Sequence, residues 1–184
     1  MLAGLALLTL TACASPSIAA PSAPTELGPE DGYVAVGETI GLDDDLPAIA
    51  NLDPALRAAL ESAAAAAAER GIAFRFTDAW RSERYQQQLF DDAVLQYGSE
   101  AEALRWVKPA TESAHVVGRA VDVANADAMD WLTRWGAEYG LCQIYANEPW
   151  HYEYIDGVTG ECPPQRPDSS DRDRQADTGA AAGG

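Results

Sequence analysis

One stretch of the chain is marked as a helix at both of its ends. DPALRAALESAAAAAAERG, residues 53 to 71, begins with Asp53 as an N-cap, has a proline at the first helical position and ends at Gly71 as a C-cap. Its apolar face carries Leu56, Leu60, Ala63 and Ala67. Because alanine is the best helix former and its small side chain allows close packing, we expect a buried helix here and not a low-complexity run.

Helical and extended patterns alternate along the part of the chain that follows. IAFRFTDAW, residues 72 to 80, alternates apolar and polar residues as a strand does, and helices are expected from a capping Ser82 to residue 97 and from about 127 to 139. RAVDVA, residues 119 to 124, and EPWHYEYI, which begins at residue 148, again alternate like strands. This order predicts an α+β fold, with a small, mostly antiparallel sheet and helices packed around it.

The two ends of the chain lack such patterns. Residues 13 to 45 contain stretches such as SPSIAAPSAP and LDDD, and they are expected to form a flexible linker. Residues 166 to 184 are nearly devoid of large apolar side chains and are expected to be a disordered tail. We therefore expect one domain, residues 46 to 165, since 184 residues leave little room for a second core. We also expect the protein to be a monomer.

The N-terminus resembles an export signal. MLAGLALLTLTACASPS is apolar but shorter than the roughly 20 residues of a membrane-spanning helix. LTAC resembles a bacterial lipobox, which predicts a signal peptide over residues 1 to 12 and acylation of Cys13. A plain signal peptide is the alternative, because the usual positive first segment is missing. We expect an exported lipoprotein, tethered by this lipid to the outer face of the cytoplasmic membrane.

Charge and cysteine content narrow the choice of partners. The chain has 29 acidic and 12 basic side chains, a net charge of −17, and it has no basic cluster, which argues against nucleic acid as a partner. Cys142 and Cys162 remain as an even pair once Cys13 carries lipid. In an oxidising compartment such a pair is expected to form a disulfide, and two reduced thiols are the alternative.

The only two histidines of the chain each lie close to carboxylates. His115 precedes Asp122, which lies in the middle of a short apolar strand and is costly to bury without a partner. Gly118 between them allows the backbone to fold back. Strand alternation directs His151 toward a cleft and directs three aromatic residues toward the core, Trp150, Tyr152 and Tyr154.

Two imidazoles and one carboxylate are a suitable three-ligand set for Zn2+, with a fourth position left for water. His115, Asp122 and His151 are therefore candidate metal ligands, and Glu148 is a candidate general base. Taken singly, a histidine is more often an ordinary core or surface group, and a glutamate near a turn is usually solvated. The coincidence of all four favours a zinc site in a cleft over the sheet.

Three motifs resemble those of the D-alanyl-D-alanine carboxypeptidases similar to VanY. SAHVVGRAVD, residues 113 to 122, resembles SxHxxGxAxD, EPWH, residues 148 to 151, resembles ExxWH, and WRSERYQ, residues 80 to 86, resembles YRSxxxQ. They occur in the family's order, and the resemblance covers about residues 53 to 163. It departs from the family at Ala114, where many relatives carry glutamate, and at Trp80, where tyrosine is usual. The resemblance therefore does not define the exact substrate pocket.

The resemblance implies a zinc peptidase with His115, Asp122 and His151 as ligands and Glu148 as catalytic base. It further implies that Arg81 holds the substrate's carboxylate or the developing oxyanion, and that two residues make secondary substrate contacts, Gln86 and Ser113. The ordinary alternatives are an ion pair between Arg81 and Asp78, a helix cap at Ser82 and a solvated Gln86.

The implied activity is removal of the terminal D-alanine from peptidoglycan stem peptides. Three alternatives stay open at this point. They are an L,D-carboxypeptidase, an endopeptidase that cuts between L-alanine and D-glutamate, and a non-catalytic zinc-containing module that binds the cell wall, like the distantly similar hedgehog signalling domain. The presence of Glu148 and Arg81 argues against the last.

Overall fold

The computed structural model describes residues 26 to 171. The expected signal peptide and Cys13 lie outside the described residues, as do residues 172 to 184. Within the described residues, none of the helices has the length and apolar character needed to cross a membrane. The elements are η1 (Pro29–Asp31), α1 (Pro47–Ala50), α2 (Pro54–Ala68), β1 (Phe76–Asp78), α3 (Glu83–Tyr97), α4 (Glu100–Ala103), β2 (Ala120–Val123), α5 (Ala126–Trp135), η2 (Gly136–Tyr139), β3 (Leu141–Gln143) and β4 (His151–Tyr154).

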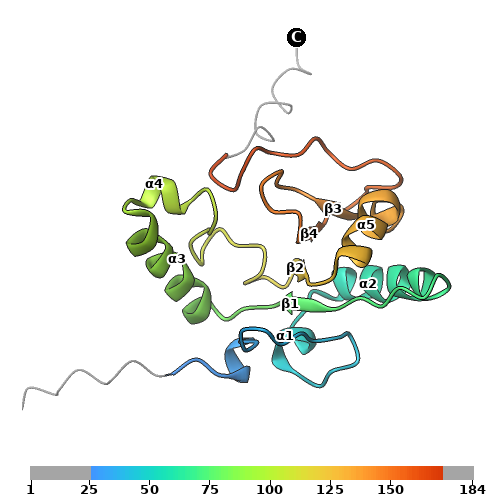
Figure 1. Cartoon of the computed structure of the whole chain (residues 1–184), viewed down its shortest axis with the longest axis horizontal. Coiled ribbons are helices and arrows are strands. Elements are labelled where there is room, and N and C mark those ends of the chain that lie inside the picture. The colour runs from blue at the N-terminus through green and yellow to red at the C-terminus, as the bar shows by residue number, and fades with distance from the viewer. Residues whose placement is uncertain (1–25, 172–184) are drawn as a thin grey trace, which may run out of the picture.

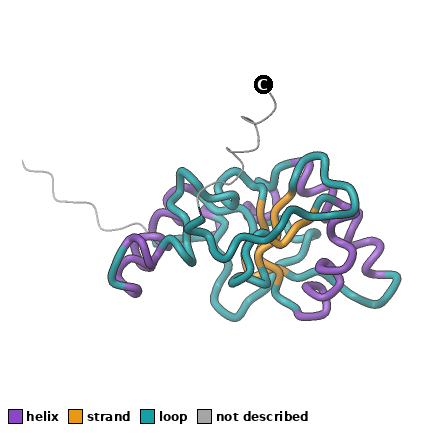
Figure 2. The backbone as a smooth tube through the Cα atoms, turned by 90° about the horizontal axis from the view of Figure 1, so that it is seen from above, coloured by secondary structure: helices purple, strands orange, loops and turns teal. Residues whose placement is uncertain are grey.

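The four strands form one antiparallel sheet in the order β1-β2-β4-β3, which confirms the predicted fold class. The register places Asp78 beside Asp122 and Asp122 beside His151. Helices α3 and α4 lie on one side of the strands and α2 and α5 on the other (Figure 1), and the view from above places the strands between the two groups (Figure 2). The sheet register therefore brings two carboxylates and one histidine into a row.

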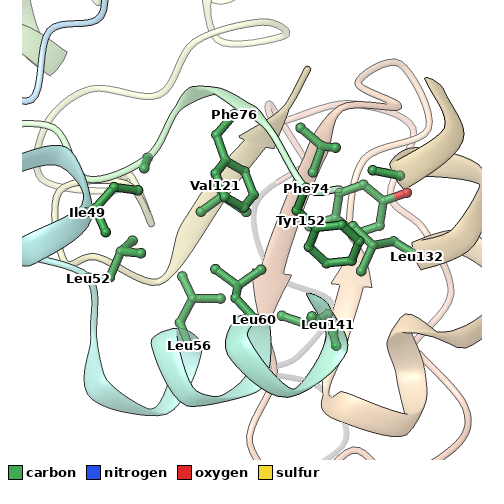
Figure 3. Packing of buried hydrophobic residues seen from close by; sticks show 14 of the residues in the cluster. Ile49, Leu52, Leu56, Leu60, Phe74, Phe76, Val121, Leu132, Leu141 and Tyr152 are labelled. Atoms are coloured by element: carbon green, nitrogen blue, oxygen red, sulfur yellow. The ribbon is translucent and has the colours of Figure 1, made fainter. Parts of the chain in front are cut away.

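Helix α2 begins as its N-terminal signals predict, but it ends at Ala68 with Glu69 as its C-cap, two residues before the expected C-cap Gly71. The Asp53 side chain accepts a hydrogen bond from the Ala55 amide at 2.9 Å, and Gly71 adopts a positive φ of 73° after the helix ends. The apolar face of α2 packs on the sheet, where Leu56 and Leu60 point toward the strand residues (Figure 3). The main core combines this face with α5, and its fully buried members include Ile49, Leu56, Leu60, Phe76, Val121, Leu132, Leu141 and Tyr152.

Residues 28 to 45, expected to belong to a flexible linker, instead pack on the domain. Ile40 is buried and exchanges backbone hydrogen bonds with Phe76 at 2.8 and 2.9 Å. Burial would raise the pKa of Asp31, but hydrogen bonds from Ser82 and Arg84 outweigh it and lower that pKa. Composition is a poor guide here because a few well-partnered side chains suffice to hold a glycine-rich segment in place.

The start of the expected disordered tail is also ordered. Arg166 pairs with the chain around Tyr145 through backbone hydrogen bonds of 2.8 and 2.9 Å, and Ser169 is buried with its hydroxyl donating to the Leu104 carbonyl at 2.7 Å. The predicted disulfide between Cys142 and Cys162 is present, with Cα atoms 5.6 Å apart. The domain in this structure therefore extends beyond the expected boundary at residue 165.

Candidate metal centre and active site

Three buried side chains aim one ligand atom each at a common point. The His115 Nε2 atom lies 3.2 Å from His151 Nδ1 and 3.4 Å from Asp122 Oδ1, and the last two atoms are 3.1 Å apart. Ligands about 2.0–2.1 Å from a tetrahedral Zn2+ are about 3.3 Å from one another. The donor set and its spacing therefore fit one such ion, and this is the group of described residues that could hold a metal.

The fold positions these ligands by two different means. Asp122 and His151 are register partners on β2 and β4, whereas His115 lies in a turn that precedes β2. Gly118 closes this turn with a φ of 70°, and its carbonyl accepts a hydrogen bond from the Asp53 amide at 2.9 Å. A Cβ atom at Gly118 would lie 2.5 Å from a backbone oxygen, so both the conformation and the space demand glycine.

Hydrogen bonds fix which ring nitrogens face the ligand point. The Nδ1–H of His115 donates to the Ala79 carbonyl at 2.7 Å, and the Nε2–H of His151 donates to Glu153 Oε1 at 3.1 Å. The opposite nitrogens, His115 Nε2 and His151 Nδ1, therefore face Asp122 and can serve as metal ligands once His151 Nδ1 gives up its proton. Metal-binding histidines usually have such a partner on the second nitrogen, because it sets the tautomer and the ring orientation.

The electrostatics at this point favour a cation. Burial would raise the pKa of Asp122, but His115, His151 and Arg81 outweigh it and hold that pKa well below its usual range. Burial would lower the pKa of His151, but the hydrogen bonds that it donates to two carboxylates, Asp122 and Glu153, raise it to about 10. The site therefore attracts positive charge strongly, which a bound divalent ion would supply.

Glu148 lies beside the three ligands in the same cleft. Its side chain is buried, and its Oε1 atom has no hydrogen-bond partner among the described residues. Burial raises the pKa of Glu148 to about 7, with nearby Asp122 adding to the rise and His151 opposing it. A carboxylate with a pKa near neutrality and without a partner is suited to accept and return a proton.

Arg81 is held by carboxylates on both sides. Its Nη2 donates to Asp122 Oδ2 at 2.7 Å, its Nε lies 3.0 Å from Asp78 Oδ2, and its Nη1 donates to Gln86 Oε1 at 3.0 Å. Gln86 is buried, with its amide donating to the Lys108 carbonyl at 2.7 Å, so it is not solvated. The ion pair between Arg81 and Asp78, expected as the ordinary alternative to a substrate contact, is present. Arg81 also lines the cleft, so both expectations for this residue apply.

The cleft has a volume of about 220 Å3 and contains most of the residues singled out in the sequence. Ser113 lines it, whereas Ser82 caps α3 through the Tyr85 amide at 3.1 Å, as the ordinary alternative predicts. Trp150, expected in the core, is 38% exposed and lines the cleft, because β4 begins only at His151 and strand alternation does not reach back to it.

Glu153, which was not among the residues predicted for the site, contacts His151 and also lines the cleft. Its signal was present, since residues two apart on a strand share a face and Glu153 follows His151 by that spacing. Tyr145 and Lys108 were overlooked as well, and no local pattern marks them. The Tyr145 ring centre lies 5.3 Å from that of His151 and 5.7 Å from the Lys108 ammonium.

A buried His-Asp-His group on a small antiparallel sheet, beside an unpartnered glutamate, is typical of metal-dependent hydrolases. The family model described as VanY, D-alanyl-D-alanine carboxypeptidase, matches residues 50 to 157. The chain belongs to this family of carboxypeptidases, and it is a hydrolase. A comparison with curated proteins gives no match.

Solved structures of related fold agree with the family. VanYB in complex with D-alanine-D-alanine is 25% identical, with a TM-score of 0.52, over 56% of this chain and 71% of that one. A VanY D,D-pentapeptidase from a VanB-type resistance cassette, in complex with Zn(II), has 24% identity and a TM-score of 0.53, over 64% and 78% of the chains. The LD-carboxypeptidase LdcB has 25% identity and a TM-score of 0.50, over 60% of each chain.

Proposed function

We propose that this protein is a zinc carboxypeptidase that removes the terminal D-alanine from peptidoglycan stem peptides. The observation that carries the proposal is the meeting of three buried donor atoms, from His115, Asp122 and His151, within 3.1 to 3.4 Å of one another. These residues would hold the ion. Membership of the VanY family and the likeness to VanYB, crystallised with D-alanine-D-alanine, support the substrate.

The residues of the cleft divide the chemistry of hydrolysis among them. Zn2+, when bound, polarises the scissile carbonyl and lowers the pKa of water toward neutrality. Glu148 accepts the proton of the attacking water and then delivers it to the nitrogen of the departing D-alanine. Its burial and its unpartnered Oε1 atom support this role, because this oxygen has no hydrogen bond among the described residues that must break before it accepts a proton.

Arg81 supplies permanent positive charge beside the reacting carbonyl. Its guanidinium group already pairs with Asp78 and Asp122 and does not bind the terminal carboxylate in this assignment. We assign Arg81 two roles, to stabilise the developing oxyanion and to hold the ligand Asp122 in place. Lys108, which lines the same cleft, is then the cation for the free carboxylate of the substrate. Ser113 and Gln86 complete the polar wall of the cleft as secondary substrate contacts.

An L,D-carboxypeptidase is the second candidate, and the likeness to LdcB favours it specifically. The two activities differ in the stem that is cut, since one releases D-alanine from a pentapeptide and the other from a tetrapeptide. A free terminal carboxylate is common to both, so Lys108 serves either substrate. An endopeptidase needs no such cation, and activity on a peptide with an amidated end would favour it.

We further propose that the protein acts outside the cytoplasm, on the cell wall, as a monomer anchored by lipid on Cys13. The disulfide between Cys142 and Cys162 supports export, because such bonds persist in oxidising compartments. Mass spectrometry of the N-terminal peptide from membranes tests the anchor. A diacylated Cys13 is the expected result, and an uncleaved or unmodified N-terminus would contradict it.

D-Alanine release tests the activity. The zinc-loaded full-length protein is assayed with pentapeptide and tetrapeptide stems, with metal content measured on the same sample. We expect one zinc per chain and release from the pentapeptide that chelator abolishes. Glu148→Gln should keep its zinc and lose about 10²–10⁴-fold in kcat, the usual contribution of a general base. Full activity in Glu148→Gln would refute the role of Glu148 as general base. Release of D-alanine from the tetrapeptide alone would replace the proposed activity with that of an L,D-carboxypeptidase.

A further inference from the structure

The segment from residue 158 to 171 lies beyond the family match, which ends at residue 157, yet it is tied down at several points. The disulfide holds Cys162, the backbone of Arg166 pairs with the chain around Tyr145, and Asp168 forms a 2.9 Å ion pair with Arg105. In Figure 1 this orange-red segment runs from the β3 end of the sheet toward α4. The fold thus holds it in one fixed position.

Val158 and Cys162 pack against the small cluster around Cys142, but packing of the core does not explain the rest of this segment. Among the described residues, none from 163 to 171 belongs to the three clusters of buried apolar side chains. The sequence PPQRP, residues 163 to 167, instead forms one wall of a groove of about 580 Å3. The loop from Thr111 to Val117 also lines the groove, as do Tyr145 and Glu153. We call this cavity the tail groove.

The tail groove adjoins the catalytic cleft. Five residues line both cavities, namely Lys108, Ser113, Ala114, Tyr145 and Glu153. Glu153 also contacts the candidate metal ligand His151, so the groove opens directly beside the reacting groups. A peptide that leaves the cleft past these shared residues would enter the groove.

The two cavities differ in size in the way that a carboxypeptidase substrate requires. The cleft of about 220 Å3 holds the metal ligands and Glu148, and it has room for little more than the scissile bond and one small residue. The groove of about 580 Å3 has room for several residues. A carboxypeptidase releases one residue on one side of the bond and keeps the rest of the peptide on the other.

We propose that the tail groove binds the residues of the stem peptide that precede the scissile bond. This rests on the proposed function and adds to it a subsite, one wall of which lies outside the family match. The walls present apolar surface at Val117 and Ile155 and charged side chains of both signs, Arg166 and Glu112. Walls with charges of both signs suit a peptide whose side chains carry carboxylates and amines.

Filling the groove from either wall tests the proposal. Val117 is 63% exposed and lines one wall, and the exposed Gln165 lines the other. Val117→Trp and Gln165→Trp are compared with Val36→Trp, a control at a 97% exposed position outside both cavities. KM is measured on zinc-loaded full-length protein with a stem pentapeptide and with N-acetyl-D-alanyl-D-alanine, which ends at the cleft.

The ratio of the two KM values is the readout. We expect the KM for the pentapeptide, divided by the KM for the dipeptide, to rise at least about tenfold in both groove variants, the usual scale for a changed pocket contact. The same ratio should stay constant in Val36→Trp. An unchanged ratio would overturn the proposal, as would a rise only for stems that still carry their sugars, which would assign the groove to glycan. Failure of the proposed function looks different, because the unsubstituted protein would then release D-alanine from neither substrate.

A binding measurement tests the groove even if the protein releases no D-alanine from either substrate. The Kd of the pentapeptide is determined by calorimetry on zinc-loaded Glu148→Gln protein with and without Val117→Trp. Weakening of at least about tenfold for the pentapeptide, with less effect on the dipeptide, supports the groove whichever bond is cut. Equal Kd values in the two proteins would overturn it.

Discussion

Removing the carboxylate of Glu153 should weaken zinc binding without removing a ligand. Glu153 Oε1 lies 3.1 Å from His151 Nε2, and the Glu153 side chain is only 19% exposed, so water cannot readily take its place. A hydrogen bond to a charged group contributes about 1.5–3 kcal/mol, and each 1.4 kcal/mol is a factor of ten. We therefore expect Glu153→Ala to bind zinc about ten- to a hundredfold more weakly, the range usual for such partners.

Competition with a chromophoric chelator measures this affinity, and circular dichroism of the metal-free protein shows whether the variant is folded. Glu153→Gln keeps an oxygen acceptor and should recover much of the loss, whereas Glu161→Ala at an exposed position should have no effect. If Glu153→Ala is folded and binds zinc as tightly as the unsubstituted protein, Glu153 does not orient His151 and the tautomer assignment for this ring is wrong.

Three further outcomes are expected. Gly118→Ala should lower the free energy of unfolding by more than about 1 kcal/mol, because the positive φ of 70° and the close backbone oxygen both oppose a Cβ atom, and a denaturant titration with unchanged stability would contradict this. Asp31 should stabilise the fold above its ordinary pKa of about 3.9, and this contribution should be lost as the pH falls through its lowered native pKa, so Asp31→Asn should flatten the acid limb of a plot of stability against pH. Reduction of the disulfide, whose cysteines are 20 residues apart, should lower the free energy of unfolding by about 3 kcal/mol, which thermal unfolding with and without reductant would measure.

The metal ligands were predictable because their signals are local. His115, Asp122 and His151 each lie in a short motif, and strand alternation alone places Asp122 and His151 on defined faces. The pairing of Arg81 with both Asp78 and Asp122 was not fully predictable, because it depends on the register of β1 against β2. Register is a property of the assembled sheet, and a single strand does not reveal it.

Segments that pack through a few contacts were the least predictable part of the fold. Ile40 stands alone as a large buried side chain between glycine- and aspartate-rich turns, so its segment has the composition of a linker although it pairs with Phe76. Ser169 is likewise one buried polar residue in a polar stretch. Their partners are far away in the sequence, and neither composition nor periodicity reports such contacts.

The disulfide has a consequence for when the enzyme becomes complete. Cys162 ties the start of the proline-rich wall to Cys142 on β3, and the candidate zinc ligands lie elsewhere in the sheet and its loops. A newly made chain in a reducing cytoplasm can therefore fold its core and bind metal while this wall is held only by its noncovalent contacts, such as the Asp168–Arg105 ion pair. We expect affinity for long stems to mature only after export and oxidation, so that the cell's own wall precursors are spared until the protein reaches the compartment where trimming belongs.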